Sequence, residues 1–256
     1  MRHYEFFDLT VAEGIADIAM NRPPLNVLHS AMMAEFNAIL EGVVRDTSLV
    51  AIVLRGRGKV FSAGVDVADH APAKVGESIP LFHGIFRKLA VSDALTIAAV
   101  HGAALGGGCE LASSCDIVLA SEKATFGQPE VKLAALAPVA AGILPLKVGL
   151  AKAIELTALG GTIDAEEARR IGLVNQIFPA VTFESDVQKY LSQLGSLSRP
   201  VVRLAKRTVS QSARRLFLSE LECNEHVYLS ELMKLSDAGE GIAAFLEKRT
   251  PNWKHA

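Results

Sequence analysis

The most constraining feature of this sequence is a run of three glycines, residues 106–108, between an apolar segment and a carboxylate. The apolar residues 96–100 predict a buried strand, and the residues from Glu110 onward predict a helix that begins at the turn. Glycines let other groups approach the backbone, and a helix start leaves N–H donors unpaired with positive dipole character. The turn could therefore stabilise a developing negative charge, with Glu110 on the same helix face available for proton transfer. A glycine-rich turn with an ordinary capping glutamate explains this stretch alone equally well.

The composition limits the classes of protein to consider. The chain has 256 residues, half of them hydrophobic, which suits one α/β domain or a domain with an appendage. A net charge of -2 gives no electrostatic case for binding nucleic acid or a membrane surface. Three cysteines without metal-like spacing favour a reducing cytoplasm and predict no metal site. No uncharged run reaches the ~18–20 unbroken apolar residues that a membrane span needs, and no signal peptide is evident.

Hydrophobic periodicity divides the chain into two parts. We expect strands at 4–10, 14–20, 50–54, 96–100, 117–120 and 174–178, and helices at 30–44 and 80–91. Ser30 is expected to be the N-cap of the first helix, and the polar residues 69–78 are expected to form a loop. The pattern is helical from residue 138 onward, apart from the strand at 174–178. The sequence thus predicts an α/β core over 1–195 and a helical region over 196–256.

Three separated motifs carry a family resemblance. They are FSAGVD at 61–66, ALGGGCELA at 104–112 with a Cys-Asp pair at 115–116, and FGQPE at 126–130. In this order, and with NRPP at 21–24 and AFLEKR at 244–249, the chain resembles the crotonase, or enoyl-CoA hydratase/isomerase, superfamily. The resemblance covers essentially the whole chain. It implies a spiral of ββα units and a C-terminal helical region that builds homotrimers, commonly paired into hexamers.

The resemblance also implies the residues of an acyl-CoA site. The backbone amides of Val65 and Gly107 would form an oxyanion hole, and Glu110 and Glu130 match the two glutamates of hydratases. Hydration needs one carboxylate that takes a proton from water and one that protonates the α-carbon. We assign the first role to Glu110 and the second to Glu130, although both could hold the same water. An acid that works while buried needs a raised pKa.

Further residues are assigned to coenzyme A by the same resemblance. Ala63, Asp66 and Val67 would border the adenine of coenzyme A. Lys248 would contact its phosphates, often from a neighbouring subunit. The cofactor expectation is coenzyme A as part of the substrate, with no prosthetic group. Ala68 stands where many relatives carry a basic residue, which puts one phosphate contact in doubt.

Several branches of the superfamily stay open as alternatives. Residues 137–142 replace a usual glycine-rich turn, and with residues 61–70 they resemble the cyclic dienoyl-CoA hydratases of anaerobic aromatic degradation. Ordinary short-chain hydratases of fatty acid metabolism are the other reading. An isomerase would keep only the glutamate at position 130, and hydrolases of the family need a nucleophilic carboxylate where Leu136, Pro138 and Val139 stand. An RNA-binding relative is disfavoured by the net charge.

The C-terminal third also predicts self-association. Its apolar stripe exceeds what a small helical appendage can bury, and large exposed apolar patches usually mark interfaces. The stripe consists of Leu216, Leu218, Leu221, Val227 and Leu229.

Overall fold

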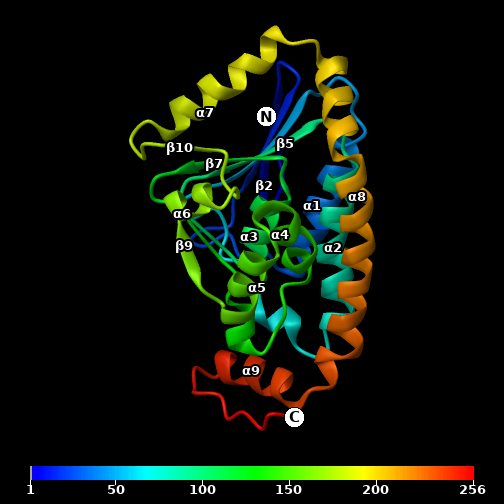
Figure 1. Cartoon of the computed structure of the whole chain (residues 1–256), viewed down its shortest axis with the longest axis vertical. Coiled ribbons are helices and arrows are strands. Elements are labelled where there is room, and N and C mark those ends of the chain that lie inside the picture. The colour runs from blue at the N-terminus through cyan, green and yellow to red at the C-terminus, as the bar shows by residue number, and fades with distance from the viewer. Residues whose placement is uncertain (1) are drawn as a thin grey trace.

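A seven-stranded sheet forms the centre of the computed structural model, which describes residues 2–256 (Figure 1). Its strands follow the order β1-β2-β3-β4-β5-β7-β10, antiparallel from β1 to β3 and parallel from β3 onward. The strands are β1 (Arg2–His3), β2 (Phe7–Ala12), β3 (Ile15–Met20), β4 (Ala51–Gly56), β5 (Leu95–Val100), β7 (Ile117–Ser121) and β10 (Gln176–Phe178).

Helices cover both faces of this sheet. The α-helices are α1 (Ser30–Val43), α2 (Val75–Val91), α3 (Gly107–Ser114), α4 (Pro138–Val148), α5 (Leu150–Leu159), α6 (Ala165–Arg170), α7 (Phe183–Ser192), α8 (Arg199–Ser230) and α9 (Ser236–Leu246). Alternate residues of β4 show the two faces, because Ile52 and Leu54 pack in the main core with α1–α4 while Ala51 and Val53 pack against α7. A parallel strand buried on both faces has this continuous apolar sequence.

A second, three-stranded sheet brings the three sequence motifs together. It consists of β6 (Ala103–Leu105), β8 (Thr125–Gly127) and β9 (Thr162–Asp164). Ala104 pairs with Phe126 across β6 and β8, and an isolated bridge pairs Ser62 with Ala104 on the other side. Because both pairings are parallel, the chain runs in the same direction through all three motifs. The residues that follow 62, 104 and 126 are therefore neighbours in space.

The C-terminal helices pack along the core and close one end of it. The 32-residue helix α8 runs beside α2 and α4, and α9 lies across the end of the molecule (Figure 1). Helix α9 contacts two 3₁₀ helices, η1 (Val67–His70) and η2 (Pro129–Leu133). The first directly follows the motif at 61–66, and the second begins within the motif at 126–130. In the described part of the chain no helix is long and apolar enough to cross a membrane. The division of the chain into a core over 1–195 and a helical region over 196–256 stays a prediction.

Local details differ from the sequence-based expectations. Helix α2 begins at Val75 rather than at 80, so the loop expected at 69–78 is shorter than predicted. Val75 and Ile79 pack against Tyr228, and this packing extends the helix N-terminally past Pro80. Ser30 is the first helical residue of α1 and not its N-cap. Strand β9 lies where only helix was expected.

The first turn of α1 is instead capped from a distant part of the chain. Asp69 Oδ2 accepts hydrogen bonds from Ser30 N at 2.7 Å and from Ser30 Oγ at 2.9 Å. A carboxylate at a helix N-terminus satisfies unpaired N–H groups and favours the helix dipole. This contact fixes η1 against α1.

Candidate active site

Two backbone turns meet at the site, and each contains a glycine that its conformation requires. Gly64 has φ 102° and Gly106 has φ 51°, both in the left-handed region that favours glycine. A Cβ on Gly64 would lie 2.9 Å from Leu105 O and 3.2 Å from Gly107 N, so no larger residue fits between the turns. No acceptor within residues 2–256 takes the N–H of Val65 or Gly107. Two free amide donors thus lie beside each other at the start of α3.

These donors border a cavity of about 290 Å³. Val65, Gly107, Glu110 and Glu130 all contribute to its wall. Most of the remaining wall is apolar and comes from α2, from the residues before and at the start of α4, and from α9. These apolar residues include Ile79, Phe82, Leu136, Pro138, Ile242 and Phe245.

Glu110 is placed by α3 and held by the start of α4. Its side chain is 2 % exposed, and Oε1 accepts a hydrogen bond from Ala140 N at 2.8 Å. Burial raises the pKa of Glu110 to about 7, while hydrogen bonds from the Ala140 and Val139 amides oppose the shift. The first turn of α4 therefore favours the carboxylate form. Glu110 can take up or release a proton near neutral pH.

Glu130 lies on η2, next to the glycine turn. A Cβ on Gly106 would stand 2.7 Å from Glu130 Oε1, so the carboxyl group rests directly over the turn. Glu130 Oε2 is buried and has no hydrogen-bond partner among the described residues. Burial, and then the charge of Glu110, raise the pKa of Glu130 well above its usual value. Because the charge of Glu110 opposes ionisation of Glu130, the pair resists losing both protons and can combine an acid with a base at one pH.

The remaining predicted site residues divide into two groups. Ala63 and Val67 line the same cavity as the glutamates. Asp66 does not line it, because Oδ1 turns back to accept a hydrogen bond from Ala68 N at 3.0 Å and caps η1. Lys248 is exposed, lies two residues beyond α9 and is also outside the cavity wall. No group of acidic, histidine and cysteine side chains in the part of the chain described could hold a metal ion.

Other cavity residues were not anticipated. His70, at the end of η1, lines the cavity, as do Phe82 of α2 and Phe245 of α9. The spacing of Ile79 and Phe82 in the sequence could have placed them on one helix face, but not which face meets the site. Phe245 lies 115 positions after Glu130, and no local pattern connects the two.

Comparisons with known proteins agree with this fold. Residues 10–256 match the family model described as Enoyl-CoA hydratase/isomerase. A "Probable enoyl-CoA hydratase" of Mycobacterium bovis is 36% identical over 98% of this chain and 99% of its own. The "Cyclohexa-1,5-dienecarbonyl-CoA hydratase" of Thauera aromatica is 34% identical over 93% of this chain and 92% of its own. The crystal structure of an enoyl-CoA hydratase from Mycobacterium avium subsp. paratuberculosis superposes with a TM-score of 0.88 at 28% identity, covering 97% and 98% of the two chains.

The chain therefore belongs to the enoyl-CoA hydratase/isomerase family and has the crotonase fold. It is an enzyme of the enoyl-CoA hydratase type. The sequence-based prediction of family, fold class and enzyme type is confirmed.

Proposed function

We propose that this chain adds water across the α,β double bond of an enoyl-CoA thioester, using Glu110 as base and Glu130 as acid. The observation that supports it most is the pair of carboxyl groups in the cavity wall, both with a raised pKa, beside the two free amides of Val65 and Gly107. Hydration consumes the conjugated thioester and lowers its absorbance. Measuring this absorbance over time with a panel of acyl-CoA substrates tests the proposal. Absence of hydration with every enoyl-CoA would refute it.

The geometry suggests the order of events. Ionised Glu110 takes a proton from water, and the hydroxide adds to the β-carbon. Negative charge then moves to the thioester oxygen, where each of the two backbone donors contributes roughly 2.7–4 kcal/mol. Protonated Glu130 delivers a proton to the α-carbon. Ala63, Asp66 and Val67 are proposed to border the adenine of coenzyme A and Lys248 its phosphates, with no metal or prosthetic group taking part.

The raised pKa values of the two carboxyl groups predict a bell-shaped pH profile. We expect kcat/KM to rise as the pH increases through about 7, because Glu110 must lose its proton to act as base. At higher pH the rate should fall when Glu130, whose pKa is raised by burial and by the charge of Glu110, loses the proton it donates. Initial rates in constant-ionic-strength buffers measure both limbs. If both carboxyl groups had the ordinary carboxylate pKa, the profile would be flat between about pH 5 and 8. A flat profile over that range would therefore contradict this assignment.

The acyl group is proposed to be a cyclic dienoyl thioester, such as a cyclohexadiene-carbonyl group. The relative from Thauera aromatica supports this proposal, as does Pro138, which lines the cavity at the start of α4. Of residues 138–141, only Pro138 lines the cavity. Val139 and Ala140 are fully buried in the core, and Ala141 is exposed outside the cavity wall.

We therefore expect cyclohexa-1,5-dienecarbonyl-CoA to have a higher kcat/KM than crotonyl-CoA. A rigid ring fills a compact apolar cavity without the ordering entropy of a flexible chain. Steady-state rates with the two thioesters make the comparison directly. A clear advantage for crotonyl-CoA would place the enzyme among the short-chain hydratases of fatty acid metabolism instead of aromatic degradation.

We propose that a second copy of the chain covers the outer face of the first half of α8, and that α5 carries further exposed apolar side chains. The apolar stripe expected in the sequence is not this face, because Leu221 is fully buried within the chain and only Leu216 of the stripe is largely exposed. The exposed apolar side chains lie elsewhere on the two helices, with exposed fractions of 51–87 %. They are Leu150, Ile154, Leu159, Val201, Leu204 and Val209.

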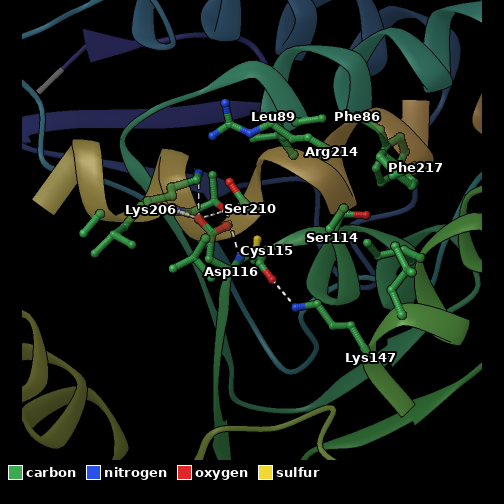
Figure 2. Close-up of a pocket in the computed structure, with 18 of the residues that line it drawn as sticks. Phe86, Leu89, Ser114, Cys115, Asp116, Lys147, Lys206, Ser210, Arg214 and Phe217 are labelled. Carbon is green, nitrogen blue, oxygen red and sulfur yellow. Dashed lines mark hydrogen bonds and ion pairs between the residues drawn. The ribbon is translucent and has the colours of Figure 1, made fainter. Parts of the chain in front are cut away.

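A second hollow supports this interface. A cavity of about 600 Å³ lies between α2, α4 and α8, with the exposed residues Leu146 and Val209 in its wall (Figure 2). On its floor Lys206 forms an ion pair with Asp116 at 2.6 Å, and Lys147 donates to the Cys115 carbonyl. An apolar rim around an unfilled hollow fits side chains of another subunit.

Light scattering should therefore show a trimer or hexamer at micromolar concentration. Val209→Glu would bury a charge at the interface and is expected to shift the population to smaller species. Val181→Glu is the matched control, because Val181 is 93 % exposed on a loop away from this face and its charge should leave the mass unchanged. A monomeric wild-type protein would contradict the proposed assembly.

The enzyme is proposed to work in the cytoplasm. Cys109, Cys115 and Cys223 are all free thiols, which suits a reducing compartment. Cell fractionation followed by the hydration assay tests this location.

A further inference from the structure

His70 is a polar group in an otherwise mainly apolar part of the active-site cavity. The ring lines the cavity together with Val67, Ile79, Phe82 and Phe245. Besides the two glutamates, the other charged side chain in the wall is Lys132, which is exposed. His70 is half-buried, and no hydrogen bond to Nε2 is formed within residues 2–256. A residue of the cavity wall thus has a ring nitrogen without a partner in the described chain.

A buried tyrosine determines which ring nitrogen carries the proton. Nδ1 of His70 lies 2.8 Å from the hydroxyl of Tyr228, which is fully buried and has no other hydrogen-bond partner in the described structure. Burial lowers the pKa of His70, against the charges of Asp69 and Asp66, so the ring is neutral. Burial also raises the pKa of Tyr228, as do the nearby charges of Glu130 and Glu110.

The hydroxyl proton of Tyr228 has one available acceptor, which is Nδ1 of His70. In the alternative tautomer Nδ1 would carry the proton and the phenol proton would be buried without an acceptor, which is unfavourable. Tyr228 therefore donates to Nδ1, and the ring proton of His70 is on Nε2. The pair presents one N–H donor to the cavity.

We propose that His70 is a specificity-determining residue that donates a hydrogen bond from Nε2 to an oxygen atom of the acyl group. A purely hydrocarbon acyl group would leave this N–H without an acceptor once water is displaced, and such unpaired donors discriminate strongly between substrates. A hydroxyl or carbonyl remote from the reacting double bond satisfies it. The inference rests on the proposed hydratase function and refines the proposed cyclic acyl group to a ring that carries an oxygen atom, so that an unsubstituted cyclohexadiene-carbonyl group is not its best substrate.

A matched pair of thioesters tests the inference. The pair is cyclohex-1-enecarbonyl-CoA and the same thioester with a ring hydroxyl or carbonyl remote from the double bond. We expect the wild type to favour the oxygenated thioester by about tenfold in kcat/KM, and His70→Phe to bring the ratio to about one. Tyr228→Phe should lower the ratio as well. Phenylalanine keeps the size of the ring but has no hydroxyl to hold the proton of His70 on Nε2. His226→Phe, at an exposed position of α8, is the matched control and should keep the wild-type ratio.

Two readouts separate this inference from the hydratase proposal. If neither thioester is hydrated, the ratio of their dissociation constants gives the same comparison without turnover. A wild-type ratio near one for every oxygenated ring, or an unchanged ratio in His70→Phe, would overturn the role of His70. Nitrogen-15 NMR of the His70 ring should show the Nε2–H tautomer in the wild type, and an Nδ1–H tautomer would equally overturn it.

Discussion

Replacing Glu130 by glutamine is expected to reduce kcat for hydration by about 10²–10⁴-fold, the usual contribution of a general acid. The amide has the size of the protonated carboxyl group that burial and Glu110 maintain at this position, but it cannot give up a proton at neutral pH. Because the uncharged form is already the one that fits the buried site, binding of the thioester should change little. Rapid-quench turnover and equilibrium binding of a non-reactive acyl-CoA measure the two quantities separately.

Glu110→Gln should reduce kcat by a similar factor for a different reason. Its side-chain oxygen can still accept the hydrogen bond from Ala140 N, but the amide cannot take a proton from water. The two losses should not add in the double variant, since both groups act on one set of protons. Glu166→Gln, at an exposed position of α6, is the control and should retain wild-type turnover. Near wild-type activity in either active-site variant would remove that residue from the mechanism.

The same substitutions provide a test of folding. Burial raises the pKa of both carboxyl groups above the ordinary value of 4.5. Their contribution to the free energy of unfolding is therefore fully present at pH values below 4.5, and it is lost as the pH rises through the folded-state values. A glutamine has no such loss. Both variants should resist denaturant at least as well as the wild type above pH 7, so lost activity cannot be attributed to unfolding.

The arrangement of the motifs could be predicted because it depends on local sequence and strand pairing. The glycine turn, the strand before it and Glu110 follow one another within fifteen residues, so their geometry is set locally. The parallel pairing of Ser62, Ala104 and Phe126 then brings the other two motifs to the same place. The crotonase resemblance implied that the three motifs share one site, but no single motif specifies this pairing.

What could not be predicted depends on contacts between distant segments. Glu110 is held by the backbone amide of Ala140, which lies 30 positions later in the chain. His70 contacts the hydroxyl of Tyr228, which lies 158 positions later. No periodicity encodes such partners, because they depend on how α4 and α8 pack on the core. The apolar stripe of α8 illustrates the same limit, since Leu221 faces the core and Leu216 faces outward.

The C-terminal helices consequently serve the active site as well as any assembly. Ile242 and Phe245 of α9 close the cavity, and Tyr228 of α8 orients His70 within it. Residues 196–256 were expected mainly to build an oligomer. Their contribution to the wall of the same chain's cavity means that a change in α8 or α9 can alter substrate preference without touching the glutamates.

Gly106→Ala is expected to reduce kcat by at least about 10²-fold while leaving the protein folded. The new methyl group would stand 2.7 Å from Glu130 Oε1, closer than real Cβ contacts allow, so the carboxyl group must move away from the α-carbon of the substrate. Displacing a general acid from hydrogen-bonding reach removes its contribution of about 10²–10⁴-fold. The backbone at residue 106 has φ 51° and ψ -127°, which L side chains rarely adopt, and it adds strain of about 1–3 kcal/mol.

Gly58→Ala separates these two effects. Gly58 also has a left-handed φ, 79°, but an added Cβ there meets no atom within 4 Å. Each variant should lose free energy of unfolding, measured by urea denaturation, because each places an alanine at a positive φ. Only Gly106→Ala should lose activity. If both variants keep wild-type kcat, the close contact between residue 106 and Glu130 has no catalytic importance, and the position of that carboxyl group is not what limits proton delivery.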